Sequence, residues 1–320
     1  MALCVIFGGA GFVGTHLATH FLKSKRFTKV HIADLRETAL QDLPGITSSI
    51  TDVRLPISLD LPEKPEWIFN LAAIHREPGH EPEEFYHTNI KGAEQVCDFA
   101  ERVGCSKIYF TSSIAVYGYC LTKTDENKEK NPVTPYGSSK IAAEQIHQNW
   151  ASKDTSRRLI ISRPGVIYGP GDPGNIMRMI KAIRKGYFAI PGSKHIHKSY
   201  AYIYGFLESI DYTMARAEQL ISYNYVETPT ETLDDVTRSV KNIFKSNAPI
   251  VAIPLPILVS GARVLQIFLG KSNPIHPVRV RKAATPTYIV PQVLLDLGFQ
   301  FKYDFTSSIK HWLSVAPEDF

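Results

Sequence analysis

Short, continuously apolar runs alternate with longer segments of helical periodicity through the first half of the chain. Leu3 to Phe7 is the first run, and Val13, Leu17 and Phe21 follow it at the spacing of one helix face. Strands that are apolar at successive positions are typical of parallel sheets covered on both faces. Further apolar runs occupy residues 29–33, 67–73, 107–113 and 159–164, with helical patterns at 83–97 and 136–150 between them. The pattern predicts an α/β fold with a doubly wound parallel sheet and a smaller C-terminal part.

Three glycines separate the first apolar run from the first helix. Gly8 permits a tight turn, Gly11 lets the backbone approach a pyrophosphate, and Gly14 lets the helix pack close to the strand. The N–H groups at the start of the helix, near Phe12 and Val13, then face the phosphates. This strand, turn and helix predict a dinucleotide-binding site.

The second apolar run is followed by Asp34, twenty residues beyond Gly14. A carboxylate at this place accepts hydrogen bonds from an adenosine ribose and repels a 2′-phosphate, so we expect NAD as the cofactor. Arg36 leaves NADP open, because a guanidinium two residues further on can hold that phosphate. Asp52, followed by Val53, is a candidate for binding the adenine amino group, with a solvated loop carboxylate as the alternative.

Small side chains follow the third strong apolar run. Leu71, Ala72 and Ala73 come at the carboxyl end of the predicted strand, the edge at which an open α/β sheet binds its ligands. We therefore expect the cofactor to cross the chain here. Asn89, in the next helical segment, is predicted to order the loop beside the active site; the alternative is a simple amide on a helix surface.

Tyr136 and Lys140 carry the second strong chemical signal. Their spacing on a helix places both side chains on one face, about one turn apart. A lysine cation beside a phenol lowers its pKa and helps it act as a general acid or base toward a hydroxyl or carbonyl. Ser113, at the end of its strand, can hydrogen-bond the same oxygen. These three residues predict hydride transfer between a nicotinamide and a secondary alcohol carbon.

Composition narrows the function classes. The chain has 320 residues, a net charge of +5 and no dense basic run, which suits an anionic substrate and argues against nucleic acid. Its four cysteines show no metal-ligand spacing, so we expect no metal. Because the first strand begins the chain, we expect no cleaved signal peptide and a cytoplasmic location. A Gly/Pro-rich break near residue 169 separates a cofactor part, residues 1–167, from a substrate part, 168–320, with some segments returning to the first.

One late segment is strongly apolar. Residues 249–269 approach the length of a membrane span, but three prolines, Gly261 and Arg263 argue against one continuous buried helix. We expect a strand followed by a core helix, and the alternative is a patch that rests on a membrane surface.

Taken together, these motifs resemble the extended short-chain dehydrogenase/reductases that modify nucleotide sugars. The resemblance covers nearly the whole chain and is carried by the glycine motif, Asp34, Asp52-Val53, Asn70 to Ala73, Ser112-Ser113, Val116-Tyr117-Gly118, Tyr136 with Lys140, and Arg163-Pro164. It implies a role for Pro164 beside the cofactor and a homodimer formed through the helices near residues 90–105 and 138–152. An asparagine that often holds the substrate in this family is replaced by Gly165.

A narrower likeness is to the N-acetylglucosamine 4-epimerases that act on polyprenyl-diphosphate-linked sugar. It is carried by His75-Arg76, residues 110–113, 198–202, 223–226 and 278–282. It implies that His75 and Arg76 line the sugar pocket, or else cap a loop. Arg279 and Arg281 are candidates for the diphosphate, because guanidinium groups match phosphate oxygens, or else they belong to a solvated basic strand. Gly165 would give a sugar room to turn, or else admit a different sugar.

Three functions follow from these observations. The first is an NAD-dependent 4-epimerase of a diphosphate-linked N-acetylhexosamine in surface polysaccharide synthesis, at the cytoplasmic face of the membrane if the carrier is a lipid. The second is an NAD(P)H-dependent reductase of a 4-keto-6-deoxy sugar, and the third a non-catalytic dinucleotide sensor. Sugar dehydratases of similar fold carry an Asp-Glu pair directly after the position of Ser113. Ile114 and Ala115 stand there, so we do not expect water elimination.

Overall fold

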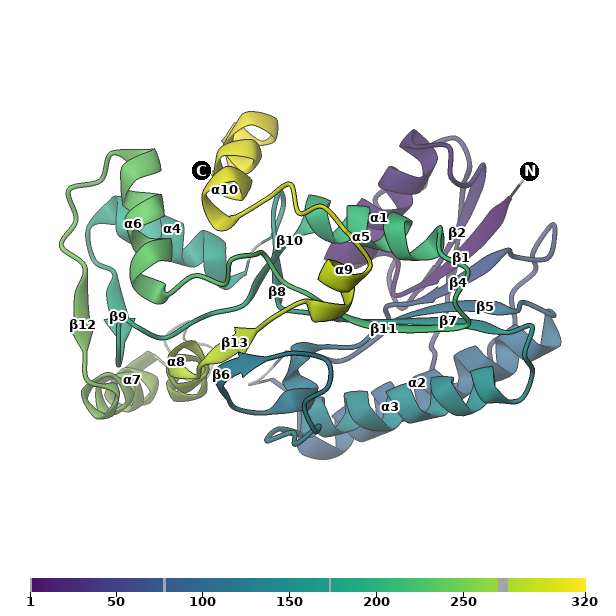
Figure 1. Cartoon of the computed structure of the whole chain (residues 1–320), viewed down its shortest axis with the longest axis horizontal. Coiled ribbons are helices and arrows are strands. Elements are labelled where there is room, and N and C mark those ends of the chain that lie inside the picture. Colours follow the sequence, from purple (N-terminus) through teal and green to yellow (C-terminus); the bar gives the residue numbers. More distant parts are fainter. Residues whose placement is uncertain (1, 77–78, 173, 270–275) are drawn as a thin grey trace.

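A seven-stranded parallel sheet forms the centre of the computed structural model, which describes residues 2–76, 79–172, 174–269 and 276–320 (Figure 1). The strand order is β11-β7-β5-β4-β1-β2-β3, and every neighbouring pair is parallel. The strands are β1 (Leu3–Phe7), β2 (Lys29–Asp34), β3 (Ile46–Ile50), β4 (Trp67–Asn70), β5 (Lys107–Thr111), β7 (Arg158–Pro164) and β11 (Leu220–Tyr225). The predicted doubly wound parallel sheet is confirmed.

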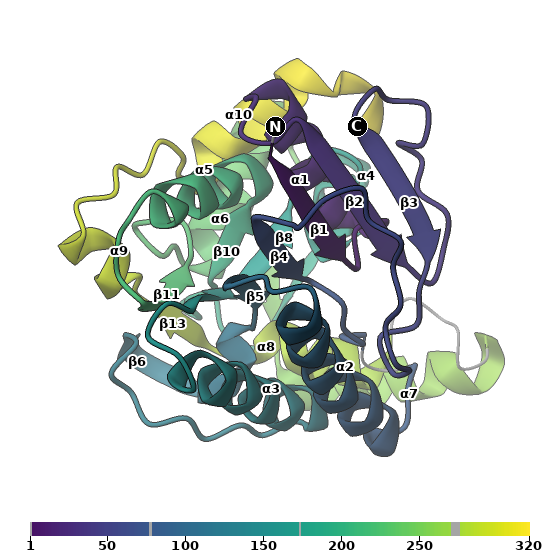
Figure 2. The same cartoon turned by 90° about the vertical axis from the view of Figure 1, so that its right-hand side faces the viewer.

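Helices cover both faces of this sheet (Figure 2). On one face lie α2 (Pro82–Arg102) and α3 (Pro135–Ser152), and on the other α1 (Phe12–Lys23) and α5 (Ile203–Met214). The pleat of β1 divides its side chains between two cores: Cys4 and Ile6 join one apolar cluster, and Val5 and Phe7 the other. Burial on both faces explains why the run is apolar at every position.

The strand order reverses between β1 and β4, and this reversal positions the site. The backbone N–H of Leu71 donates to the carbonyl oxygen of Phe7 at 2.9 Å, so the chain leaving β4 crosses the carboxyl end of β1. Asp34 ends the neighbouring strand at the same edge. In an open α/β sheet, the point where the winding changes direction is where ligands bind.

Beyond the central sheet the chain builds a second, smaller part (Figure 1). Its short strands pair in twos: β8 (Val166–Tyr168) with β10 (Tyr200–Tyr202), β9 (Ala189–Pro191) with β12 (Val251–Ile253), and β6 (Cys120–Thr124) with β13 (Thr287–Ile289). The remaining helices are α4 (Asn175–Lys185), α6 (Leu233–Phe244), α7 (Leu255–Leu269), α8 (Pro277–Ala284), α9 (Gln292–Asp296) and α10 (Phe305–Val315), with 3₁₀ turns η1 (Ile114–Tyr117) and η2 (Pro317–Asp319).

Segments from the late part of the chain return to the early part. Strand β11 completes the central sheet beside β7, and β13 pairs with β6. Glu126, in the loop after β6, accepts hydrogen bonds from the backbone N–H groups of Asn224 (2.7 Å), Gln292 (3.1 Å) and Val293 (3.3 Å). These hydrogen bonds join segments on both sides of residue 167. The division of the chain into two parts at that residue stays a prediction.

One sequence interpretation differs from the structure. The basic strand offered as the alternative for Arg279 and Arg281 is wrong, because both residues lie in helix α8. Pro277 occupies the first helical turn, and the His276 side chain accepts from the N–H of Val278 at 3.2 Å, so the helix has a local start signal. Strand β3 had no apolar run because it is an edge strand with a largely exposed side-chain pattern.

The apolar segment 249–269 forms β12 and α7, but α7 is no core helix. Val259 and Ala262 are its buried side chains among those described, and most of its other side chains are exposed or half-buried. None of the described helices combines the length and hydrophobicity needed to cross a bilayer.

Candidate active site

The glycine turn between β1 and α1 is closely packed. Gly8 has φ of +76°, and a Cβ built on it would lie 2.7 Å from the backbone nitrogen of Ala72. A Cβ on Gly14 would lie 2.5 Å from the Cα of Gly9, so the helix approaches the turn as only glycine allows. The cap of α1 is Gly11, which has no side chain to accept from the first N–H groups of the helix. Those donors stay available to an anion.

Asp34 is fixed beside this turn. Its Oδ2 accepts from the N–H of Ala10 at 3.0 Å, and its Oδ1 from the N–H of Arg36 at 3.2 Å. The Arg36 side chain is 73% exposed, with its Nε 4.0 Å from Asp34 Oδ1. The carboxylate is therefore placed by the backbone rather than by a tight ion pair, and Arg36 is left to reach outward.

Asp52 has a partner that the sequence interpretation missed. Arg54 donates to it with Nε at 2.9 Å and Nη2 at 2.6 Å, and these hydrogen bonds lower the pKa of the carboxyl. The sequence did contain a signal for this pair, because Asp52 and Arg54 carry opposite charges and lie two residues apart in one loop. Val53 is buried against Gly92 of α2, where an added Cβ would lie 3.0 Å from Val53 Cγ2. Both residues stay predicted cofactor contacts.

Asn89 holds the loop that follows β4. Its Oδ1 accepts from the N–H of Ile74 at 2.9 Å, and its Nδ2 donates to the Ile74 carbonyl at 3.1 Å and to Ser139 Oγ at 2.9 Å. The amide thus pins the segment after Leu71, Ala72 and Ala73 to α3. This is the loop-ordering role expected for it; a direct contact with the cofactor stays a prediction.

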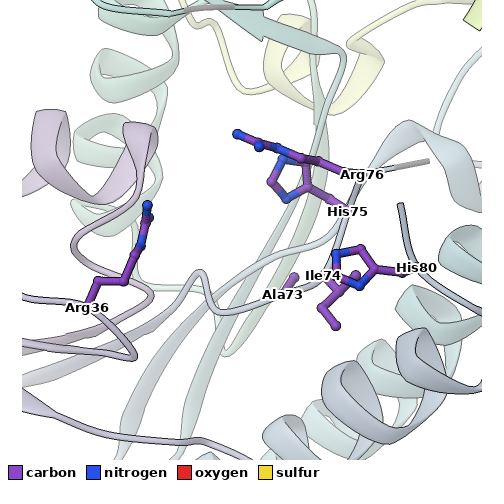
Figure 3. Close-up of a pocket in the computed structure, with 6 residues that line it drawn as sticks. All are labelled: Arg36, Ala73, Ile74, His75, Arg76 and His80. Atoms are coloured by element: carbon purple, nitrogen blue, oxygen red, sulfur yellow. The ribbon is translucent and has the colours of Figure 1, made fainter. Parts of the chain in front are cut away.

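A pocket of about 260 Å³ opens between the loops that follow β2 and β4 (Figure 3). Arg36 stands on one side and His75, Arg76 and His80 on the other, and none of the described residues that line it is acidic. Burial lowers the pKa of His75, with the Arg76 charge acting in the same direction, so the ring is neutral at pH 7. The pocket suits an anionic group held by guanidinium side chains.

The first turn of α3 packs against the turn η1, and this contact gathers the catalytic candidates. A Cβ on Gly137 would lie 2.5 Å from the carbonyl oxygen of Ala115. Ser113 caps η1, its Oγ accepting from the N–H of Ala115 at 3.2 Å. Tyr136 precedes Gly137, is half-buried, and sets its ring edgewise to Phe85 at 6.3 Å between centroids. The turn that begins at Ser113 and the helical turn that carries Tyr136 therefore pack together, and both side chains keep partial exposure.

Lys140 lies one turn further along α3 and is 2% exposed. Its Nζ donates to the carbonyl oxygen of Thr111 at 2.7 Å and sits 4.6 Å from the centre of the Phe110 ring. Burial lowers the pKa of Lys140 to about 7, against the opposing charge of Glu144. The ammonium is held at the carboxyl end of β5, two residues before Ser113.

A buried ion pair joins Glu144 of α3 to Arg163 of β7. Arg163 donates to Glu144 with Nε at 2.8 Å and Nη2 at 2.9 Å, and with Nη1 to Tyr117 Oη at 2.8 Å. Lys130 adds a second cation, 2.9 Å from Glu144. Sequence reasoning missed Glu144, although its position four residues after Lys140 places it on the same helix face. Pro164, the next residue after Arg163, ends β7 at the ligand edge of the sheet.

Gly165 has a packing role that corrects the expectation of a roomier sugar pocket. A Cβ at this position would lie 2.5 Å from the carbonyl oxygen of Ser199 and 3.2 Å from Val226 Cγ1. The backbone of the segment leading into β10 occupies the space that the missing side chain leaves. Contact of the Gly165 backbone with a substrate stays a prediction.

Arg279 and Arg281 lie on α8 and are not among the residues that line the pocket of Figure 3. Lys198 holds the end of this helix, because its buried Nζ donates to the carbonyl oxygens of Lys282 (3.1 Å) and Thr285 (2.8 Å). Arg279 is half-buried and Arg281 exposed. Within the described residues, no group of three His, Cys, Asp or Glu side chains could hold a metal ion.

Comparisons of the sequence with known proteins identify a family and two relatives. The model of the NAD dependent epimerase/dehydratase family matches residues 4–241. In Escherichia coli O157:H7, N-acetyl-alpha-D-glucosaminyl-diphospho-ditrans,octacis-undecaprenol 4-epimerase is 30% identical over 315 residues, or 97% of this chain and 93% of that protein. UDP-glucose 4-epimerase of Vibrio cholerae is 30% identical over 190 residues, 56% of each chain.

Solved structures show the same fold. ADP-L-glycero-D-manno-heptose-6-epimerase of Helicobacter pylori is similar with a TM-score of 0.76 at 18% identity, covering 99% of this chain and 96% of that one. UDP-glucuronic acid 4-epimerase from Bacillus cereus in complex with NAD gives a TM-score of 0.75 at 17% identity, over 96% of both chains.

Proposed function

Because this chain belongs to the NAD dependent epimerase/dehydratase family, we propose that it epimerises C4 of a diphosphate-linked N-acetylhexosamine with NAD as cofactor. The observation that carries the proposal is the packing of the turn after half-exposed Ser113 against the first turn of α3, which carries half-exposed Tyr136, with Lys140 buried one turn along the same helix. A non-catalytic sensor has no need of this arrangement.

The residues at the glycine turn fit the cofactor. A Cβ at Gly8 or Gly14 would fill the close approach between turn, helix and β4, and the open N–H groups near Phe12 and Val13 suit a pyrophosphate. Asp34 suits the adenosine ribose. Bound by these residues, NAD would supply the hydride acceptor and donor that epimerisation at C4 of the sugar requires.

The chain's own residues handle the proton. In the phenolate form, Tyr136 Oη takes the proton of the C4 hydroxyl as the sugar becomes a ketone, and gives it back when the alcohol re-forms. One acid–base group therefore serves both directions, as an epimerase requires. Ser113 Oγ donates a hydrogen bond to the same sugar oxygen, and the Lys140 ammonium favours the phenolate.

Elimination of water is disfavoured by the residues that follow Ser113. Ile114 and Ala115 form the start of η1, and Ile114 is buried. Neither hydrocarbon side chain can transfer a proton. The sugar dehydratases that this fold resembles carry an Asp-Glu pair at these two positions. This favours the epimerase half of the family's chemistry.

We propose a lipid as the carrier of the sugar. The E. coli relative, named for a diphospho-undecaprenol sugar, matches 97% of this chain, whereas the UDP-glucose 4-epimerase matches 56%. Such a substrate would bring the enzyme to the cytoplasmic face of the membrane. His75 and Arg76 are the candidates on the cofactor side for the sugar and its diphosphate, and Arg279 and Arg281 those on α8. A homodimer through α2 and α3 rests on the family resemblance, and sedimentation tests it.

The deciding assay supplies UDP-N-acetylglucosamine and its undecaprenyl-diphosphate counterpart with catalytic NAD and no reductant. We expect the galacto epimer from the lipid-linked sugar, and none from a Tyr136→Phe control. If neither substrate is epimerised while a 4-keto-6-deoxy sugar consumes stoichiometric NAD(P)H, the enzyme is a reductase and the proposal fails.

A further inference from the structure

A long stretch of the second part carries positive charge alone. Between Asp235 and Asp296 lie sixty consecutive residues without Asp or Glu, although the chain's average of 31 acidic residues in 320 would place about six there. The same stretch contains eight Lys and Arg residues: Arg238, Lys241, Lys245, Arg263, Lys271, Arg279, Arg281 and Lys282. It includes all of α7 and α8.

Helix α7 turns its apolar side outward. Val259 and Ala262, three residues apart, are buried against the protein. Ile257, Val264 and Phe268 follow each other at intervals of seven and four residues, which places them together on the opposite side of the helix. The exposed large apolar side chains of α7 are Ile257, Val264, Leu265, Ile267 and Phe268, here called the α7 apolar face. Ile267 is 80% exposed and Phe268 79%.

Exposed cations lie on α7 and on the helix that packs against it. Arg263 is exposed on α7 itself, and α8, which packs on α7, exposes Arg281 and Lys282 in its last turn (Figure 1). The hydrogen bonds from Lys198 to the end of α8 fix the position of that turn. A helix with an exposed apolar face and nearby cations, in a sequence stretch without acidic residues, is typical of segments that lie in the plane of a membrane surface.

We propose that the α7 apolar face and the exposed cations of α7 and α8 dock the enzyme on an anionic lipid bilayer, with Ile267 and Phe268 inserted at the boundary between headgroups and acyl chains. The role of this docking rests on the proposed function: it brings the site to a sugar whose diphosphate is anchored in the same bilayer. A second copy of the chain fits the face less well. A two-fold contact would set Arg263, Arg281 and Lys282 near their own copies, whereas anionic headgroups complement them.

Vesicle co-sedimentation of the full-length protein tests the docking without any sugar. We expect binding to phosphatidylcholine vesicles that contain phosphatidylglycerol, weakening as salt rises. The double variant Ile267→Asp/Phe268→Asp should bind at least about tenfold more weakly, and Arg263→Gln about fivefold. The matched control is Val315→Asp, an exposed apolar position on α10, which lies on the other side of the molecule (Figures 1 and 2). It should bind as the unchanged protein does.

Three outcomes would overturn the docking surface. One is a wild-type protein that ignores anionic vesicles, and another is a double variant that binds them normally. The third is a concentration-dependent dimer, seen by sedimentation velocity, that the double variant loses, which would assign the face to a second copy. If the double variant unfolds at a lower temperature than the unchanged protein, Ile257→Asp replaces it in the vesicle assay. Failure of the epimerase assay leaves these results unchanged, because vesicle binding needs neither cofactor nor sugar.

Discussion

Lys140 donates from Nζ to the carbonyl oxygen of Thr111 across 2.7 Å. Thr111 ends β5 and Ser113 follows it by two residues, whereas Lys140 shares its helix with Tyr136. One hydrogen bond thus joins the helix that carries the proton-transfer candidate to the strand that carries the hydroxyl. The ammonium at this joint is buried, and its burial has a cost in stability.

Replacing Lys140 by methionine should stabilise the protein at low pH while abolishing turnover. Burial lowers the pKa of Lys140 to about 7 from 10.5, so between these values the unfolded chain holds a proton that the folded one does not. The free energy of unfolding therefore rises with pH across this window, and the burial penalty is fully present below 7. We expect Lys140→Met to exceed the wild type by a few kcal/mol at pH 6, with the difference shrinking toward pH 10. Denaturant titrations at both pH values measure it, and a constant difference would contradict the assignment.

Tyr136→Phe keeps the ring beside Phe85 and removes the proton-transfer group. Turnover should fall by about 10²–10⁴-fold, with the dissociation constant of NAD within a few-fold of wild type. Single-turnover kinetics and cofactor titration separate the two effects. Tyr187→Phe, at a 68% exposed position, is the control and should behave as wild type. Near-normal turnover of Tyr136→Phe would remove the central assignment.

Asp34 should make the enzyme prefer NAD to NADP. Its carboxylate is held by two backbone N–H groups, so it stays in place to repel a 2′-phosphate. We expect NAD to bind at least about tenfold tighter, and Asp34→Asn to reduce that ratio while Arg36→Ala raises it. Fluorescence titration with both cofactors measures the ratio. Tighter binding of NADP by the unchanged protein would show that Arg36 determines the choice.

Gly165→Ala tests the packing of β8 against the segment before β10. The new Cβ would lie 2.5 Å from the Ser199 carbonyl oxygen, so we expect a loss of about 1–3 kcal/mol in the free energy of unfolding. Gly261→Ala is the matched control, because nothing lies within 4 Å of its Cβ on the exposed side of α7. That variant should gain about 0.5–1 kcal/mol from helix propensity. If both variants unfold at the same urea concentration, the close contact at Gly165 is wrong.

A buried carboxyl in the second part should make stability fall toward alkaline pH. Burial raises the pKa of Glu227 to about 8 from 4.5, while Tyr168 Oη and Ser308 Oγ each donate to its Oε1 at 2.6 Å. Stability from the retained proton is fully present below 4.5 and is lost as pH rises through 8. Glu227→Gln keeps the acceptor and cannot ionise, so its unfolding free energy should decline less across this window. Thermal melts from pH 5 to pH 9 decide, and parallel curves would refute the assignment.

Sequence reasoning reached the parts of the site whose residues carry local signals. Gly8, Gly14 and Asp34 sit in one strand, turn and helix, and the spacing of Tyr136 and Lys140 needs only a helix. The same holds for the central strands, since burial on both faces leaves an apolar run.

What the sequence did not predict depends on contacts between distant segments. Arg163 meets Glu144 from another element, and the backbone of Ser199 fills the space beside Gly165. Neither contact leaves a mark in the local pattern. The strand offered as the alternative for Arg279 and Arg281 left out the helix start signal of His276 and Pro277. The prediction that α7 is a core helix was wrong, because apolar composition does not show whether a helix is buried or exposed.

The three hydrogen bonds to Glu126 determine how the gene can be divided for expression. A fragment that stops at residue 241, where the family match ends, would lose the Gln292 and Val293 donors. Glu126 Oε2 would then lack the two backbone N–H groups that donate to it. The fragment would also lose β13, the partner of β6. Two fragments split near residue 167 would each expose an unpaired sheet edge, β7 in one and β11 in the other. Co-expression of both halves, rather than either alone, is the arrangement that could restore the fold.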